Sequence, residues 1–118
     1  MDPRVTAEIL ERRSRERSTA AERLAAGLRA HVVKTVRDRL PPEGRAWLIG
    51  SLAWGAFGTR SDIDLVLADL SEDDETVLEW ALIQSTDRAI ELLRLRDLPP
   101  AFQSRVVRDG LQIHAARD

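Results

Sequence analysis

The chain has 118 residues, no cysteine and a formal net charge of −2. This length accommodates one domain with a single modest core, so we expect residues 1–118 to form one domain. The lack of cysteine excludes a disulfide framework and a thiolate metal site, and the acidic balance argues against a dedicated nucleic-acid-binding protein.

Residues 1–40 predict a helical N-terminal region. Asp2-Pro3 is a favourable helix start, and Thr-Ala-Ala-Glu at 19–22 has the capping-box spacing that starts or renews a helix. Apolar side chains then recur every four residues and predict a face packed against the core: Leu24, Leu28, Val32, Val36 and Leu40. No apolar stretch approaches the length of a signal sequence or a membrane span, so we expect a cytoplasmic protein without membrane contact.

Four arginines between residues 12 and 17 form a basic cluster in this helical region. The cluster could contact nucleic acid or a partner protein. Glu8, Glu11 and Glu16 interrupt it, however, which favours a solvated helix face. We therefore expect no direct binding of nucleic acid.

Residues 45–115 predict a catalytic sheet with helices. Strand patterns occupy residues 45–49, 63–68, 89–93 and 111–115. Ser71 caps a helix whose expected buried side is Val77, Leu78, Ala81 and Leu82. Pro99-Pro100 opens another helix, which Gly110 ends. We expect an α/β fold of the α+β type, with a short mixed β-sheet flanked by helices. Trp47 and Trp80 are expected in the core or at a subunit contact.

Two aspartates one residue apart open the strand expected at 63–68. Side chains at positions i and i+2 of a strand project to the same face, so Asp62 and Asp64 should lie side by side. Two like charges about 4 Å apart repel by roughly 4 kcal/mol at an effective dielectric constant of 20. A divalent cation removes that repulsion, and hard oxygen ligands suit Mg²⁺.

Gly50-Ser51 follows the strand expected at 45–49. Its backbone N–H groups and hydroxyl can bind phosphates, because glycine lets the backbone approach a ligand closely. Combined with Asp62 and Asp64, this turn predicts a site for a metal ion and a nucleotide.

The order of these features resembles the minimal nucleotidyltransferase family of the DNA polymerase β-like nucleotidyltransferase superfamily. The family pattern is Gly-Ser, then Asp-x-Asp about ten residues later, then a third carboxylate on a later strand; Gly50-Ser51 and Asp62-Ile63-Asp64 match the first two parts. The resemblance implies a polymerase-β-like nucleotidyltransferase fold in which Asp62 and Asp64 bind the metal. It also implies four residues that contact the nucleotide phosphates: Gly50, Ser51, Arg60 and Ser61.

Trp54 departs from the family pattern, since many members carry an arginine before the second glycine. Arg60 lies in the same loop and could supply the basic contact instead. Trp54 itself could stack on a nucleobase or simply anchor the loop.

Glu91 is the candidate for the third carboxylate. It lies in the apolar run 89–93, where an unpaired carboxylate is costly to bury. Ile-Glu-Leu-Leu followed by Leu-Pro-Pro resembles the third strand and turn of the minimal family, so Glu91 would complete the catalytic and metal-binding set with Asp62 and Asp64. Aspartate is commoner at this position. The alternative is a glutamate on an edge strand facing water.

The resemblance implies a nucleotidyltransferase that uses ATP and Mg²⁺, with two metal ions expected. An acceptor hydroxyl would attack the α-phosphorus in line, and pyrophosphate would leave. Larger members add a helical domain that positions the acceptor, whereas this sequence ends at Asp118. We therefore expect another polypeptide or a second copy to provide the acceptor surface. In the minimal family the partner is a HEPN-type helical protein, often a toxic RNase. The transferase is the antitoxin of this partner and adds AMP to a hydroxyl of the partner. We expect the acceptor to be a tyrosine.

Two other functions stay open. The chain could be a catalytically weak antitoxin that neutralises its partner by binding alone, or a homodimeric transferase acting on a small molecule. Intact Ser51, Asp62 and Asp64 favour activity, while Trp54 and Glu91 leave the binding-only role open. The long N-terminal region and the three tryptophans indicate a surface that is buried against another chain.

Overall fold

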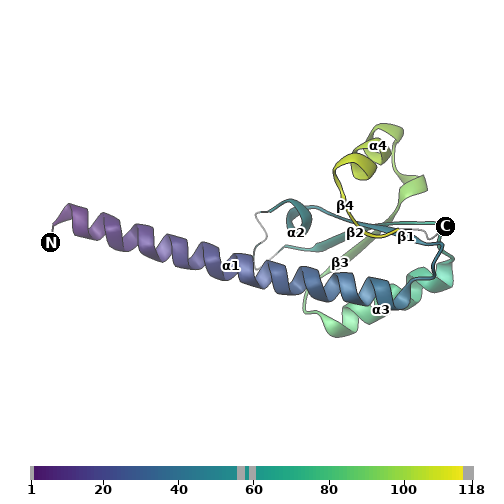
Figure 1. Cartoon of the computed structure of the whole chain (residues 1–118), viewed down its shortest axis with the longest axis horizontal. Helices are drawn as coiled ribbons and strands as arrows, with labels where there is room; N and C mark the ends of the chain where they lie inside the picture. The colour runs from purple at the N-terminus through teal and green to yellow at the C-terminus, as the bar shows by residue number, and fades with distance from the viewer. Residues whose placement is uncertain (1, 56–57, 59–60, 116–118) are drawn as a thin grey trace.

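The computed structural model describes residues 2–55, 58 and 61–115. In chain order its elements are α1 (Pro3–Arg39), β1 (Arg45–Ile49), α2 (Ser51–Trp54), β2 (Ile63–Ala68), α3 (Glu72–Ser85), β3 (Ile90–Arg94), the 3₁₀ turn η1 (Leu95–Asp97), α4 (Pro100–Asp109) and β4 (Leu111–His114). Within the described residues the strands form one sheet in the order β3-β2-β1-β4 (Figure 1). β2 and β3 are parallel, and the other pairs are antiparallel. The predicted α/β fold with a short mixed sheet flanked by helices is confirmed.

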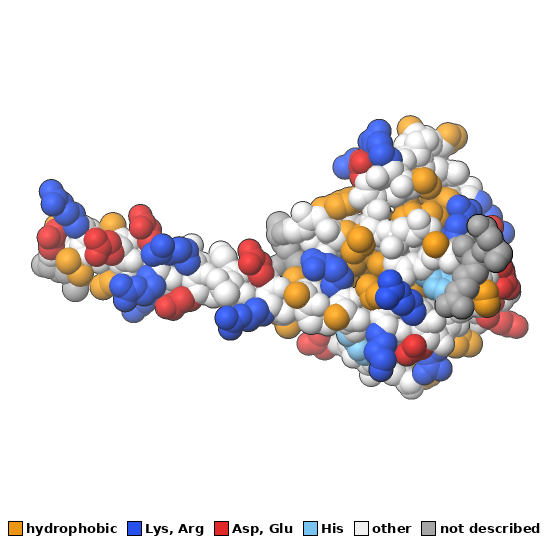
Figure 2. Space-filling model, in the orientation of Figure 1, with side chains coloured by type: hydrophobic (Ala, Val, Ile, Leu, Met, Phe, Trp, Pro, Cys, Tyr) orange, Lys and Arg blue, Asp and Glu red, His pale blue; other side chains and the backbone are white. Residues whose placement is uncertain are grey.

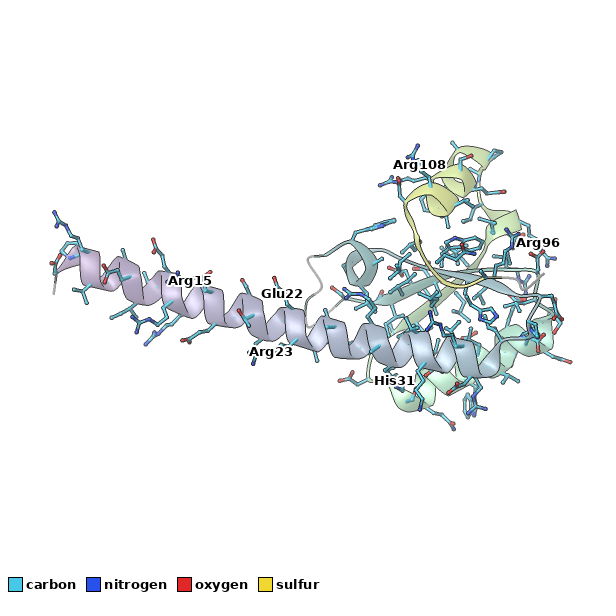
Figure 3. The ribbon with its side chains drawn as sticks, in the orientation of Figure 1. Arg15, Glu22, Arg23, His31, Arg96 and Arg108 are labelled. Carbon is cyan, nitrogen blue, oxygen red and sulfur yellow. The ribbon has the colours of Figure 1, made fainter. Side chains whose placement is uncertain are left out.

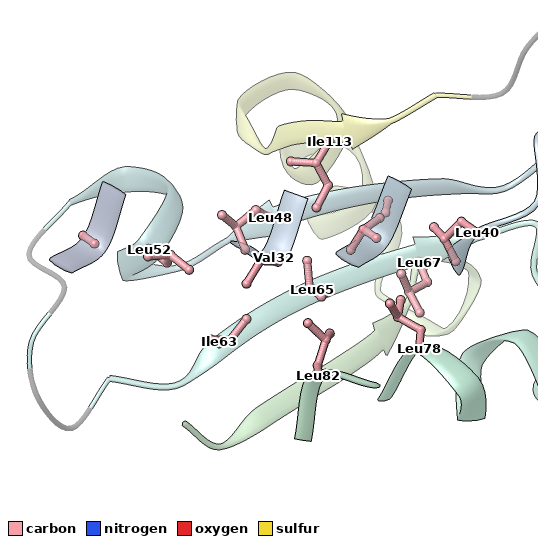
Figure 4. Close-up of a cluster of buried hydrophobic side chains, with 13 residues drawn as sticks. Val32, Leu40, Leu48, Leu52, Ile63, Leu65, Leu67, Leu78, Leu82 and Ile113 are labelled. Atoms are coloured by element: carbon pink, nitrogen blue, oxygen red, sulfur yellow. The ribbon is translucent and has the colours of Figure 1, made fainter. Parts of the chain in front are cut away.

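Each face of the sheet is covered by a different set of helices. On one face, side chains at alternate strand positions such as Leu48 and Leu65 pack with Val32 of α1 and Leu82 of α3 (Figure 4). The other face buries a smaller cluster against α4: Trp47, Ile49, Val66 and Val106. Because side chains alternate along a strand, Asp64 projects to the same face as Val66, the face that α4 covers.

α1 is one uninterrupted helix. Asp2 caps it, since its Oδ1 accepts a hydrogen bond from the backbone N–H of Arg4 at 2.9 Å. The prediction that a helix starts or renews at Thr19 is wrong, because α1 runs through this residue and the Thr19 hydroxyl donates to the backbone carbonyl of Arg15. Ala25 is the first buried residue of α1, and the helix before it extends beyond the sheet (Figure 1).

Two of the predicted core positions are exposed. Leu24 is 51% exposed because it precedes the point at which α1 reaches the sheet. Val77 also faces solvent, while Leu78 and Leu82, on the side of α3 that faces the sheet, are buried. Trp47 is buried, as predicted, but Trp80 is exposed, so the core interpretation is wrong for that residue and the subunit contact stays a prediction.

Ser71 caps α3 as predicted, since its hydroxyl accepts from the backbone N–H of Asp74 at 3.1 Å. The short helix α2 was not predicted, because a glycine-bounded segment of four residues has no readable helical periodicity. No described helix combines the length and the apolar character that crossing a membrane requires.

Candidate functional site

The candidate site lies at one end of the sheet, where β1 ends and β2 and β3 begin. In the strand register Ile49 is opposite Asp64, and Asp64 is opposite Glu91 on the parallel strand β3. Asp64 and Glu91 are therefore neighbours on one face, although 27 positions separate them in the sequence. Asp62 lies one residue before β2 and is exposed. The structure thus brings Gly50-Ser51, Asp64 and Glu91 to the same end of the sheet.

Gly50 lies directly against the Asp64 carboxylate. Its φ is +74°, a backbone conformation that favours glycine, and a Cβ atom placed there would lie 2.5 Å from Asp64 Oδ2. Any larger residue would be strained at this φ and would have to displace the carboxylate. Glycine at position 50 is therefore what allows the Gly-Ser turn and the aspartate to share this end of the sheet.

The surroundings of Asp64 raise the pKa of its carboxyl group. The pKa of Asp64 is raised from the usual 3.8 to about 6. Burial is the largest cause, followed by a hydrogen bond with the Glu91 carboxyl group and by the negative charges of Glu91 and Asp62. Within the described part of the chain no ion pair joins any of the three carboxylates to a basic side chain. Without a cation, Asp64 therefore takes up a proton near pH 6, which lowers the negative charge at this end of the sheet.

This donor set fits a hard divalent cation. Carboxylate oxygens are the ligands that Mg²⁺ prefers, and a cation would replace the proton that Asp64 holds near pH 6. No three His, Cys, Asp or Glu side chains of the described residues form a preassembled metal-binding group, however. Asp62 lies outside the strand and must come closer to Asp64 and Glu91 if all three are to bind one ion.

Ser51 opens onto a cavity between α2 and α1. The cavity has a volume of about 400 Å³ and is lined by Ser18, Ala21, Glu22, Ala25, Arg29, Ser51 and Gly55. Arg29 fixes α2 against α1, since its Nε and Nη2 donate to the backbone carbonyl of Leu52 at 3.0 and 2.8 Å. Sequence reasoning missed Arg29, because an arginine on a helix carries no signal for a contact 23 residues away.

The loop before Asp62 is held by hydrogen bonds at Ser61 and Arg88. The Ser61 hydroxyl accepts from the backbone N–H of Gly58 at 2.9 Å, and Arg88 Nη1 donates to the carbonyl of Gly58 at 2.7 Å. Ser61, a predicted phosphate contact, thus has a structural bond in this loop. Arg60, the other predicted contact in the loop, lies outside the described residues. Arg88 was not predicted; its only sequence signal is its place just before β3.

Trp54 ties α2 to α4. Its Nε1 donates to the backbone carbonyl of Asp109 at 2.9 Å, and the guanidinium of Arg105 lies 5.7 Å from its ring centroid. These contacts favour the anchoring role over stacking on a nucleobase. The C-terminal end of α4 is therefore held against the short helix that follows the Gly-Ser turn.

A second cavity, of about 340 Å³, lies at the opposite end of the sheet. Its charges are paired within the chain, because Arg45 Nε binds Asp69 Oδ2 at 2.8 Å and Arg94 Nε binds Glu75 Oε2 at 2.8 Å. Paired arginines offer little to an anionic ligand, so the site end remains the candidate for chemistry.

Known proteins provide an independent comparison. No protein-family model matches the sequence, and no curated protein matches it. Among solved structures, a chain of a toxin–antitoxin complex crystallised with AMP-PNP is 26% identical, with a TM-score of 0.57 over 73% of this chain and 72% of that chain. A structure described as a minimal nucleotidyltransferase is 25% identical, with a TM-score of 0.57 over 74% and 93%.

A mutant of the toxin–antitoxin pair MntA–HepT is also similar, at 25% identity and a TM-score of 0.56, over 75% of this chain and 73% of that chain. The chain therefore has the fold of the minimal nucleotidyltransferases. The resemblance predicted from Gly50-Ser51 and Asp62-Ile63-Asp64 is confirmed.

Proposed function

We propose that this chain is a Mg²⁺-dependent nucleotidyltransferase that transfers AMP from ATP to a hydroxyl of a HEPN-type protein, as the antitoxin of a toxin–antitoxin pair. The observation that carries the proposal is the cluster of Asp64 and Glu91 beside Gly50. A carboxylate whose pKa is raised by burial and by a neighbouring carboxyl group, next to a turn able to bind phosphate, is what a metal–nucleotide site requires. The similar toxin–antitoxin structure crystallised with AMP-PNP supports ATP as the nucleotide.

The site residues would bind the metal and the phosphates, and Glu91 would also take part in proton transfer. Asp62, Asp64 and Glu91 would hold Mg²⁺, which when bound supplies positive charge to the reacting phosphates. The Gly50-Ser51 turn would hold the β- and γ-phosphates. The Glu91 carboxylate would also accept the proton of the acceptor hydroxyl. The hydroxyl oxygen then bonds to the α-phosphorus, the bond from that phosphorus to the bridging oxygen breaks, and pyrophosphate leaves.

The acceptor hydroxyl is proposed to be a tyrosine of the partner. The chain itself contains no tyrosine, so a tyrosyl acceptor has to come from another polypeptide. The acceptor would approach the open end of the sheet, where Asp62 and Glu91 are exposed.

One observation favours a second candidate function. The described residues hold no preassembled group of three metal ligands. A chain whose Asp62 never joins Asp64 and Glu91 would be an antitoxin that neutralises its partner by binding alone.

Co-expression with the product of the adjacent gene, followed by intact-mass measurement, separates the two functions. We expect the partner to gain one or more AMP units, and the gain to disappear in Asp62→Ala/Asp64→Ala. The control Asp38→Ala/Asp97→Ala removes the same charge at exposed positions outside the site, and the AMP gain should persist. A partner that is bound and neutralised by the site variant, with no mass gain in any variant, would establish the binding-only function instead.

A further inference from the structure

The N-terminal half of α1 is largely exposed in the described part of the chain, and where this half ends Ser18, Ala21 and Glu22 line the cavity beside α2. Residues 3–24, here called the arm, extend beyond the sheet, and all of them except Thr6 are exposed (Figure 1). The exposed side chains include the large apolar residues Val5, Ile9 and Leu10 near its end. Helices in proteins gain most of their stability from packing an apolar face, so the arm is a helix that lacks its usual source of stability.

α3 carries the matching unpartnered surface. Val77, Trp80 and Ile83, here called the α3 patch, are all exposed on this helix, and Trp80 is 61% exposed. A tryptophan that offers most of its ring to solvent beside two aliphatic side chains is typical of a binding hot spot.

The arm cannot cover the α3 patch of its own chain. α3 lies beside the C-terminal half of α1, where His31 Nε2 and Ser85 Oγ are 2.7 Å apart. The arm continues the same helix in the opposite direction, away from the sheet (Figure 1). Since no bend or loop interrupts α1, the arm reaches only the α3 patch of another molecule.

The charges of the two surfaces are complementary. The arm has six arginines and four glutamates, a net charge of +2, and four of the arginines lie between residues 12 and 17. Figure 2 shows basic and acidic groups in contact with solvent along it. Arg15 and Arg23 project outward from the helix (Figure 3). α3 has five acidic residues and no basic one. Glu72, Asp73 and Glu79 are exposed and share α3 with the α3 patch. An acidic surface with an apolar centre therefore meets a basic helix with apolar side chains.

We propose that the arm binds the α3 patch of a second copy of this chain, and that two copies exchange arms. Arm and α3 patch are both present in every copy, so one contact can be made twice in a closed dimer. This dimer does not depend on the transfer chemistry. A chain inactive toward ATP would still form it.

Light scattering during size-exclusion chromatography of the full chain tests the proposal. We expect a dimer, and we expect Trp80→Glu and Leu10→Glu each to weaken it at least about tenfold. Val107→Glu is the matched control, since Val107 is 55% exposed on α4, away from both surfaces, and should leave the dimer intact. Circular dichroism verifies that each variant keeps its helices.

Charge reversal tests which two surfaces meet. Arg12→Glu/Arg13→Glu/Arg15→Glu/Arg17→Glu on the arm should weaken the dimer, and so should Glu72→Lys/Asp73→Lys/Glu79→Lys on α3. Both sets in the same chain should restore it, because the opposite charges then meet again. A monomer at all concentrations overturns the proposal, and so does a dimer that Trp80→Glu and Leu10→Glu leave unchanged. Failure of the combined chain to regain the dimer, while it stays folded, overturns the arm–α3 contact.

Discussion

The two ends of the sheet carry acidic residues in opposite electrostatic settings. At the end away from the site, Asp69 and Glu75 each bind an arginine at 2.8 Å. The Glu75 side chain is only 13% exposed, and Arg94 supplies its compensating charge. At the site end, Asp64 lies against Glu91 with Asp62 nearby, and the pKa of Asp64 rises to about 6.

This difference indicates which acids hold the fold together and which ones serve chemistry. An acid paired with arginine stabilises the fold at neutral pH and needs no ligand. Acids that repel one another lower stability at neutral pH, and a cation from outside the chain can reverse that cost. The predictions below change one end at a time, from the largest expected effect to the smallest.

Glu91→Gln should have the largest effect on transfer. The amide keeps the shape of the side chain but loses the negative charge needed for metal binding and for accepting a proton, so the rate should fall at least about 100-fold. Stability should change by no more than about 0.5 kcal/mol, since Glu91 is exposed. Steady-state transfer assays with Glu79→Gln as the control, an exposed glutamate on α3, measure the difference. Full activity in Glu91→Gln would remove Glu91 from the site.

Gly50→Ala should damage both the site and the fold. The new Cβ would lie 2.5 Å from Asp64 Oδ2 at a φ of +74°, so the carboxylate must shift. We expect a loss of about 1–3 kcal/mol in the free energy of unfolding, with transfer reduced more than tenfold. Gly27→Ala is the matched control: a Cβ there meets nothing within 4 Å, and alanine in a helix should be neutral or stabilising by up to about 1 kcal/mol. Equal effects of the two substitutions in denaturant titration would contradict the close approach at Gly50.

Arg94→Met should affect stability alone. It leaves the Glu75 carboxylate without the Arg94 Nε–H group that donates to both of its oxygens, so the melting temperature should fall. Transfer activity at a temperature where the variant is folded should match that of the unchanged chain. A loss of activity greater than the loss of folded protein would show that the two ends of the sheet are coupled.

Asp64→Asn should change how stability depends on pH in the absence of metal. Between pH 3.8 and about 6 the folded chain holds a proton on Asp64 that the unfolded chain has released. This group therefore makes the free energy of unfolding fall as pH rises through that window, and contributes no slope above it. The free energy of the variant minus that of the unchanged chain should rise with pH up to about 6 and then stay constant. Denaturant titrations across this range that show a constant difference would contradict the raised pKa.

The sequence predicted the sheet well because its strands are short apolar runs bounded by glycine, proline or charged residues. The strand predicted at 63–68 has the observed bounds of β2. Ser71 caps the start of α3 and Gly110 ends α4, both as expected. The strand register could not be predicted from the sequence. The pairing of Asp64 with Glu91 depends on a parallel contact between β2 and β3, two strands that α3 connects. Glu91 was identified from the resemblance to a family, together with the cost of burying an unpaired carboxylate in the apolar run 89–93.

The errors lie where tertiary contact decides burial. Leu24 continues the apolar pattern of α1, but it precedes the part of α1 that packs on the sheet. Val77 continues the apolar pattern of α3, but it lies on the side of α3 that faces solvent. Trp54 was expected in the loop after Gly50 but lies at the end of α2. Its hydrogen bond to Asp109 joins residues 55 positions apart and has no sequence signal. The errors at Leu24 and Val77 concern surfaces that another molecule could cover.

Calorimetric titration of ATP into the chain, with and without Mg²⁺ at neutral pH, tests most directly whether the repelling acids are a metal–nucleotide site. We expect binding that needs Mg²⁺ and that Asp64→Asn abolishes, while Arg94→Met leaves it unchanged. The same affinity in the presence and absence of Mg²⁺, or full Mg²⁺-dependent affinity in Asp64→Asn, would contradict the assignment of this end of the sheet.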